Sequence, residues 1–268
     1  MMNKIILRIL KSFYKYYLAC KNLGILNTLR ILKARFIKRE YLVKIETKLF
    51  GKIYWRSIQD YGVISHFFSP QVTFNNLSSD KKIIIDLGAN IGVETLRFNY
   101  LFPNSKIISV EPDKENFEIL KKNTHDIENI VILNNGIWNE DSFLKIKHKS
   151  IDNSQKISFT KAVSDDQSVK SITVSSIIKQ HTINKIDIIK IDIEGAEDII
   201  FDYTCDDWLA FVDILIIECP DNDSPFVTQK IFDAFRRNNL NFKTTISGEN
   251  LIFIKESCKA FPNQIELY

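Results

Sequence analysis

Five short aliphatic runs, each separated from the next by polar or helical stretches, constrain the fold of this 268-residue chain most strongly. The runs are continuous and rich in isoleucine, as is typical of strands buried on both faces of a sheet. Strands that alternate with helices predict an α/β fold with a doubly wound, mostly parallel sheet and right-handed crossovers. The runs are IIIDL, KIISVEP, NIVILNN, KIDIIKID and DILIIECP.

Two further segments extend this pattern. The sequence NFKTTISGENLIFIK predicts a closing hairpin around Ser247 and Gly248, which makes the sheet seven-stranded with an antiparallel last hairpin. Residues 139–172 are polar and alternating, which predicts added hairpins. Asp113 precedes the helical stretch KENFEILKKN and is the expected N-cap of that helix.

The first 39 residues have an unusual charge. They hold ten of the 36 basic residues and no acidic residue, whereas the remainder holds 26 basic and 33 acidic residues. Aliphatic and aromatic residues alternate with these charges at helical spacing, which fits contact with an anionic membrane or an acidic partner, or a surface helix with a solvated basic face. We expect no nucleic-acid partner. The expected organisation is a basic, mainly helical region over 1–78, an α/β domain over 79–258 and a C-terminal tail over 259–268.

The cysteines and the apolar runs bear on location. Cys20, Cys205, Cys219 and Cys258 are scattered, which suggests neither a zinc site nor a disulfide framework. No apolar run approaches the roughly 20 residues that span a bilayer, and the N-terminus lacks the pattern of a signal peptide. We therefore expect a cytoplasmic protein, with peripheral contact at the inner membrane face through residues 1–39 left open.

Acidic residues end four of the five expected strands. In sheets of this kind ligands bind at the carboxyl ends of the strands, where the strand order switches. We therefore expect a functional cleft at this edge. The strands end at Asp86, Glu111, Asn134 with Asn135, Asp192 and Glu218.

The first strand runs into the glycine turn DLGANIG, residues 86–92. This turn is GxxxG, whereas a dinucleotide pyrophosphate is held by GxGxxG at a helix N-terminus. The carboxylate of Asp86 beside the turn repels a pyrophosphate and suits a cationic ligand such as S-adenosylmethionine, which carries an ammonium and a sulfonium. Glu111 is placed to accept hydrogen bonds from both ribose hydroxyls of either nucleotide. The sequence favours S-adenosylmethionine, and a dinucleotide-dependent oxidoreductase is the less favoured alternative.

The stretches DLGANIGVET, VEPD, IDIIKIDIEGAE and ILIIEC, with the spacing between them, resemble FkbM-type methyltransferases over roughly residues 82–220. The resemblance implies a class I, Rossmann-like, S-adenosylmethionine-dependent O-methyltransferase. The implied acceptor is a sugar hydroxyl of a cell-surface glycan or of its lipid-linked or nucleotide-linked precursor. Where the family has Leu-Asp-Asp before the fourth strand, this chain has Val174, Ser175 and Ser176, so a role for that aspartate is not carried over.

The resemblance also implies a cofactor site. The glycine turn would surround the methionyl part, Glu111 would bind ribose, and residues 135–138 would lie near the adenine, although Trp138 fits plain core packing equally well. The predicted cofactor-binding residues are Asp86, Gly88, Ala89, Asn90, Gly92, Glu111, Pro112, Asn135, Gly136 and Trp138.

Methyl transfer to a hydroxyl also needs a base or a metal near the methyl group. Lys190 and Asp192 point to the same side of the fourth strand, Glu194 follows in the turn, and Glu218 ends the next strand. We predict that Lys190, Asp192, Glu194 and Glu218 are catalytic. Two alternatives stay open: Mg²⁺ held by the three acids, although we predict no metal site, or a Lys190–Asp192 ion pair and a turn-capping Glu194 with no part in the chemistry.

Glu197 and Asp198 should lie in the helix that begins near Ala196 and should be solvated. A rival from a different functional class is a non-catalytic, cofactor-binding module that docks glycan-synthesis machinery through residues 1–78.

Overall fold

The structure is a computed structural model that describes two compact units. They are Met1–Phe74 with Ile265–Tyr268, and Asn75–Gln264. The described residues are 13–14, 16–17, 19–21, 23–36, 40–47, 50–65, 72–73, 82–151, 154–165, 168–193, 195–218, 225–247, 250–258 and 266–267.

The first unit combines helices with a hairpin. Its elements are α2 (Ile25–Phe36), β1 (Leu42–Thr47), β2 (Gly51–Arg56), α3 (Tyr61–Ser65), β3 (Val72–Thr73) and β15 (Glu266–Leu267). The helix α2 contacts β1, and β1 pairs with β2 in antiparallel register. Strand β15 pairs with β3 in antiparallel register, and both strands belong to this unit.

The hairpin was missed by the expectation of a mainly helical region. Along β1 every second residue is buried, with Val43, Ile45 and Thr47 inward and their neighbours outward. A period of two is the mark of a half-buried strand. The apolar, basic helical pattern of the preceding residues does not extend into this stretch.

The second unit contains the expected strands and helices. Its elements are β4 (Ile83–Leu87), α4 (Val93–Leu101), β5 (Lys106–Val110), α5 (Lys114–Thr124), β6 (Ile130–Leu133), β7 (Gly136–Ile137), β8 (Phe143–Ile151), β9 (Ser154–Ala162), β10 (Ser168–Ile172), α6 (Val174–Gln180), β11 (Ile186–Ile191), α7 (Glu197–Ile200), two 3-10 turns (Tyr203–Asp207 and Leu209–Phe211), β12 (Val212–Glu218), α8 (Val227–Arg237), β13 (Phe242–Ser247) and β14 (Asn250–Lys255). Asp113 caps α5 as predicted, since its side chain accepts a hydrogen bond from the Asn116 amide.

The main sheet of the second unit has seven strands in the order β13-β14-β12-β11-β4-β5-β6. Strands β4, β5, β6, β11 and β12 are parallel, and the closing hairpin of β13 and β14 is antiparallel. The predicted fold class is therefore confirmed. A second sheet, in the order β7-β10-β8-β9, contains the predicted hairpin of β8 and β9.

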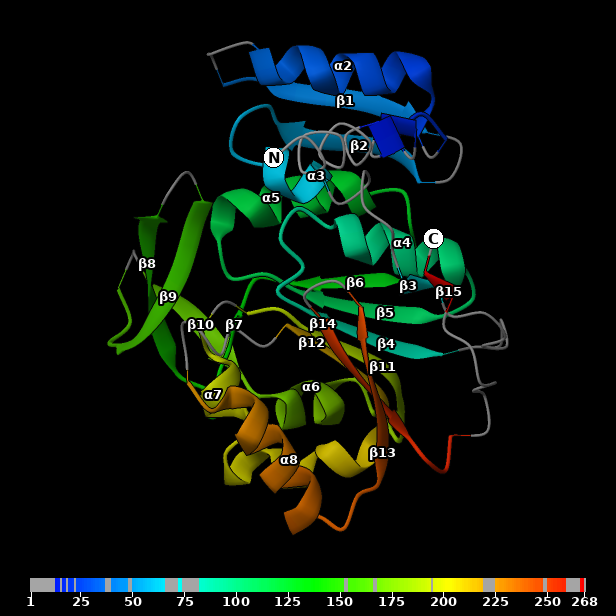
Figure 1. Ribbon diagram of the computed structural model, residues 1–268. Helices are drawn as coiled ribbons and strands as arrows, with labels where there is room; N and C mark the ends of the chain where they lie inside the picture. The colour runs from blue at the N-terminus through cyan, green and yellow to red at the C-terminus, as the bar shows by residue number, and fades with distance from the viewer. Residues whose placement is uncertain are drawn as a thin grey trace, which may run out of the picture. The chain divides into compact units, whose positions relative to one another are not determined.

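Helices cover both faces of the main sheet (Figure 1): α4 and α5 lie on one face, and α6 and α8 on the other. Successive strand residues point to opposite faces. Ile85 and Leu87 of β4 join an apolar core that includes Ile177 of α6 and Ile231 of α8. Asp86 therefore points the other way, beneath α4.

Among the residues that the structure describes, no helix is both long enough and apolar enough to cross a bilayer.

Candidate functional site

The carboxyl ends of the central strands lie side by side, as the parallel topology requires. In the register of the sheet Asp86 of β4 is flanked by Lys190 of β11 and by Ser109 of β5. Ile191 of β11 pairs with Ile217 of β12, and Asp192 and Glu218 each come one residue later. The sheet thus brings the predicted acids of the first, fourth and fifth strands to one edge.

The glycine turn forms a tight loop over residues 88–92, named here the β4–α4 loop. Gly88 has a φ of 83°, and a Cβ atom built on it would lie 1.7 Å from the carbonyl oxygen of Asp192. Asp192 in turn donates its amide hydrogen to the carbonyl of Leu87. Gly92 also has a positive φ, of 89°, and its built Cβ would lie 2.6 Å from Cδ1 of Leu120. Both glycines are needed for close packing, and Gly88 lets the β4–α4 loop touch the backbone of Asp192.

Glu111, at the end of β5, holds the β4–α4 loop from outside. Its carboxylate accepts the amide of Asn90 at 2.8 Å and, through the other oxygen, the amide of Asp113 at 2.9 Å and the side chain of Asn116 at 3.3 Å. The side chain is almost completely buried, and burial raises the pKa of Glu111 to about 7 against the opposing effect of these hydrogen bonds. A carboxylate offers about four acceptor positions, so one remains for a ligand hydroxyl.

A buried charge network lies beneath the same loop. Nζ of Lys190 is 2.6 Å from Oδ2 of Asp192, and the hydroxyl of Thr95 donates to Asp86 at 2.6 Å. Burial lowers the pKa of Lys190, but Asp192, Asp86 and Glu94 outweigh it, so that the pKa stands above its ordinary value. Burial raises the pKa of Asp86 to about 6, although Lys190 opposes the shift. Lys190 therefore stays protonated and neutralises carboxylates from both strands.

The predicted catalytic acids differ in their exposure and in whether the structure describes them. Asp192 is partly exposed, with 29% of its side chain accessible, and forms the ion pair with Lys190. Glu218 is half-buried at the end of β12. Glu194 lies outside the described residues, so the structure does not describe all three acids of the alternative metal site. Within the described part of the chain, no group of three metal-binding side chains is found.

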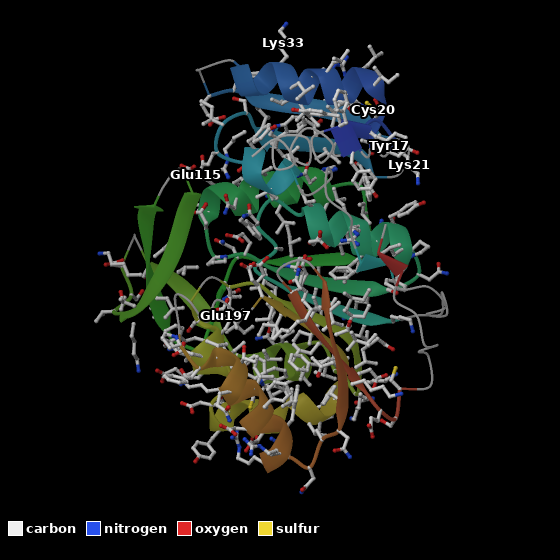
Figure 2. All side chains as sticks on the ribbon, viewed as in Figure 1. Tyr17, Cys20, Lys21, Lys33, Glu115 and Glu197 are labelled. Carbon is white, nitrogen blue, oxygen red and sulfur yellow. The ribbon has the colours of Figure 1, made fainter. Side chains whose placement is uncertain are left out.

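The structure corrects the expectation for Glu197. This side chain is 1% exposed and not solvated, and its carboxylate accepts the amides of Ile193 at 3.1 Å and Gly195 at 2.7 Å. Figure 2 labels Glu197. The helix α7 that carries it has only four residues. Glu197 therefore organises the loop over residues 192–196, named here the β11–α7 loop, in which Asp192 lies. The sequence signal that we missed is the spacing. Glu197 follows Ile193 by four residues and Gly195 by two, and the amides of these two residues lie before the helix and need an acceptor outside it.

The residues that we predict near the adenine are explained mainly by hydrogen bonds and packing within the protein. The side chain of Asn134 donates to the carbonyls of Glu111 and Pro112, and that of Asn135 donates to the carbonyl of Lys170. A Cβ on Gly136 would lie 2.7 Å from Cδ1 of Leu144, which explains this glycine by packing alone.

Trp138 packs against the apolar core and also lines a pocket of ≈ 80 Å³. The pocket is lined by Trp138, Asn139, Thr173, Val174, Ser175, Ile200, Thr204, Asp207 and Trp208. Its wall includes the first residues of α6, where the family has Leu-Asp-Asp. Asp141 brings a carboxylate to this point from outside the helix, because it accepts the amide of Thr173 at 2.8 Å and the hydroxyl of Ser176 at 2.7 Å.

The residues at this edge fit S-adenosylmethionine. Two buried acceptor atoms, Oδ1 of Asp86 and Oδ1 of Asn90, have no hydrogen-bond partner in the described structure, and Glu111 keeps one acceptor position. Buried acceptors without donors are costly, so they favour a ligand that brings N–H and O–H groups and positive charge. Ala89 lies in the β4–α4 loop, and its amide donates to the carbonyl of Val110. Pro112 directly follows Glu111.

A comparison with protein families decides the identity. The model of the FkbM methyltransferase domain matches residues 86–240. This chain belongs to that family. The predicted family is confirmed, and the chain is a member of a family of S-adenosylmethionine-dependent methyltransferases.

Relatives of this FkbM-domain protein carry methyltransferase names. It is similar to Methyltransferase 1 of Beauveria bassiana (strain ARSEF 2860), with 23% identity over 173 residues, which cover 56% of this chain and 70% of the relative. It is also similar to ribosomal RNA small subunit methyltransferase G of Prochlorococcus marinus (strain MIT 9312), with 31% identity over 127 residues, which cover 45% of this chain and 51% of the relative.

Solved structures resemble the FkbM-domain protein only weakly. Fibrillarin of Aeropyrum pernix with bound S-adenosyl-L-methionine shows 12% identity and a TM-score of 0.41, and the match covers 83% of this chain and 86% of that chain. Precorrin-6y C5,15-methyltransferase of Geobacter metallireducens shows 10% identity and a TM-score of 0.38 over 68% of this chain and 83% of that chain. Matches at this level carry no information about the acceptor.

Proposed function

We propose that this FkbM-domain protein is an O-methyltransferase that methylates a sugar hydroxyl of a cell-surface glycan or of its lipid-linked or nucleotide-linked precursor. The observation that carries the proposal is the ion pair of Lys190 and Asp192 at the carboxyl edge of the sheet, 2.6 Å between Nζ and Oδ2. It places a partly exposed carboxylate, held by a buried cation, next to the glycine turn.

The roles of the residues follow from what methyl transfer requires. S-adenosylmethionine, when bound, supplies an electrophilic methyl group on a sulfonium. Glu111, Asn90 and Asp86 hold the cofactor through its hydroxyl and ammonium donors. Asp192 accepts the proton of the acceptor hydroxyl. Lys190 keeps the Asp192 carboxylate in place, and its positive charge offsets the negative charges of Asp192 and Asp86.

The acceptor class is supported by family membership and by the type of group at the edge. A hydroxyl must lose its proton as the new bond forms, whereas a neutral amine can react before it loses a proton and a thioether has no proton to lose. A carboxylate at this place is therefore the expected partner of a hydroxyl acceptor. Sugars present several such hydroxyls, and many members of the family that this sequence resembles act on sugar hydroxyls.

The test is transfer of a labelled methyl group from S-adenosylmethionine to a panel of nucleotide sugars and lipid-linked saccharides. We expect an acid-stable, base-stable methyl ether in at least one acceptor. Asp192→Asn should lower kcat by about 100-fold and leave the dissociation constant of S-adenosylhomocysteine nearly unchanged. Asp165→Asn, which changes an exposed acid elsewhere in the unit, serves as the matched control. Label found on nitrogen or carbon, or an Asp192→Asn variant with wild-type kcat, would contradict the proposal.

A further inference from the structure

The helix α2 presents large aliphatic side chains to solvent. The outer face of α2 is defined here by Ile25, Leu26, Leu29, Arg30 and Lys33, all of which are exposed. Its three aliphatic members have 67%, 74% and 55% of their surface accessible. We propose that the outer face of α2 binds the surface of an anionic lipid bilayer. The inference is independent of the acceptor proposed above.

The outer face is distinct from the face by which α2 packs on its own unit. Thr28 and Ile31 are buried on the opposite side of the helix, and the side chain of Asn27 donates to the carbonyl of Glu46 in β1 at 2.7 Å. With about 100° of rotation per residue, positions 25, 26, 29, 30 and 33 share one arc. A helix that only covers a core carries polar side chains on this arc, so its aliphatic residues need another partner.

The charge around the outer face selects that partner. Figure 2 shows Lys33 projecting outward from α2, away from β1. The preceding helical residues add exposed Phe13, Tyr14, Tyr17 and Lys21. Because the first 39 residues hold ten basic residues and no acid, this segment is attracted to the negative surface of an acidic lipid bilayer. Aliphatic side chains that enter the interface add to this attraction.

Other occupants fit less well. A nucleic acid would use Arg30 and Lys33 but would leave Ile25, Leu26 and Leu29 in water. A second copy in a two-fold contact would bring the same basic side chains against one another without any acid in the segment to pair with them. A bilayer with acidic head groups satisfies the aliphatic and the basic members together.

The test is co-sedimentation of the full chain with lipid vesicles. One set contains equal parts of phosphatidylcholine and phosphatidylglycerol, and the other contains phosphatidylcholine alone. We expect saturable binding to the first set only, and a loss of affinity of about tenfold or more in L26S/L29S, because serine side chains at these two exposed positions would no longer enter the apolar part of the bilayer. The matched control is V163S/I246S, which replaces side chains that are 86% and 67% exposed in the other unit and should bind like the wild type.

A charge variant and an assembly measurement complete the test. R30E/K33E should also lose binding to the anionic vesicles, whereas a Lys179→Glu variant, changed at an exposed position of α6, should not. Unfolding curves of all variants should match that of the wild type. The proposal is overturned if the wild type ignores anionic vesicles, if L26S/L29S binds them unchanged, or if L26S/L29S instead converts a dimer into a monomer in light scattering.

Discussion

Two loops meet at the carboxyl edge of the sheet, and each is held by a buried carboxylate that accepts backbone amides. In the β4–α4 loop the carboxylate is Glu111, which accepts the Asn90 amide from 21 residues away in the sequence. In the β11–α7 loop it is Glu197, which accepts amides only two and four residues before it. The first loop therefore depends on the pairing of β4 with β5, whereas the second is closed by its own chain.

This difference separates binding from positioning. Glu111 accepts a hydrogen bond from the glycine turn and is also the residue that is expected to bind the ribose, so a bound cofactor and the loop would share one carboxylate. Glu197 touches no predicted ligand and acts on the loop that carries Asp192. We expect changes at Glu111 to alter cofactor affinity, and changes at Glu197 to alter the placement of Asp192.

The contact between the loops gives the largest expected effect. Gly88→Ala should destabilise the protein by more than about 4 kcal/mol, because the new Cβ would overlap the carbonyl oxygen of Asp192, 1.7 Å away, on a backbone with positive φ. Gly195→Ala is the matched control, since Gly195 also has a positive φ, of 97°, but nothing lies within 4 Å of its built Cβ. It should cost only about 1 kcal/mol in chemical denaturation. Equal losses in the two variants would show that the loops do not constrain each other.

Lys190 connects the strands that precede the two loops. Lys190→Met should cost about 3 kcal/mol of unfolding free energy, because it leaves Asp86 and Asp192 without their buried cation. Adding Asp86→Asn to Lys190→Met should recover part of this loss, which a double-mutant cycle measures. A cycle with no coupling would mean that Lys190 stabilises the fold through packing alone.

The pH dependence of stability isolates Glu111. Burial raises its pKa from 4.5 to about 7, so the folded state binds the proton more tightly than the unfolded state. The contribution of Glu111 to stability should therefore fall as pH rises from about 4.5 to about 7, by up to about 3 kcal/mol, and stay constant above. The measurement is the difference in unfolding free energy between the wild type and Glu111→Gln across this range. Glu118→Gln, at an exposed position of α5, should show no such slope, and a flat difference for Glu111→Gln would contradict the shift.

The affinity for the cofactor tests whether the Glu111 carboxylate contacts it. In either orientation the amide of Glu111→Gln turns an NH₂ group toward a backbone amide, that of Asn90 or that of Asp113. Affinity for S-adenosylhomocysteine should fall by about tenfold in calorimetric titration at pH 8, where the wild-type carboxylate is ionised. An unchanged affinity would remove Glu111 from the cofactor site.

The smallest effect is expected for a change in the β11–α7 loop. Glu197→Gln should raise the exchange rate of either the Ile193 or the Gly195 amide by about tenfold, because the glutamine keeps only one acceptor oxygen and one of the two hydrogen bonds is lost. The affinity for S-adenosylhomocysteine should change by less than about threefold, while kcat for an identified acceptor falls. If affinity falls as far as in Glu111→Gln, the two carboxylates have the same role.

Much of the site follows from local pattern. The glycine turn, the acid at the end of β5 and the residues Lys190 and Asp192 were predicted from strand ends and spacing. The structure brings them to one edge of the sheet, and their roles stay predictions. Three features escaped this reasoning: the burial of Glu197, the carboxylate that Asp141 brings to α6, and the hairpin of β1 and β2. The first two depend on which backbone amides lie nearby in space, and the third on a change of period that went unnoticed.

The sequence by itself determined the order of strands and helices, because side-chain alternation and helical spacing are properties of neighbouring residues. It also determined the family, because the motifs at the strand ends are local. Only the tertiary structure decided which charges are buried together. Lys190 and Asp86 are 104 residues apart in the chain and become neighbours through the pairing of β11 with β4. Their ionisation depends on what packs over them, and no local pattern contains that information.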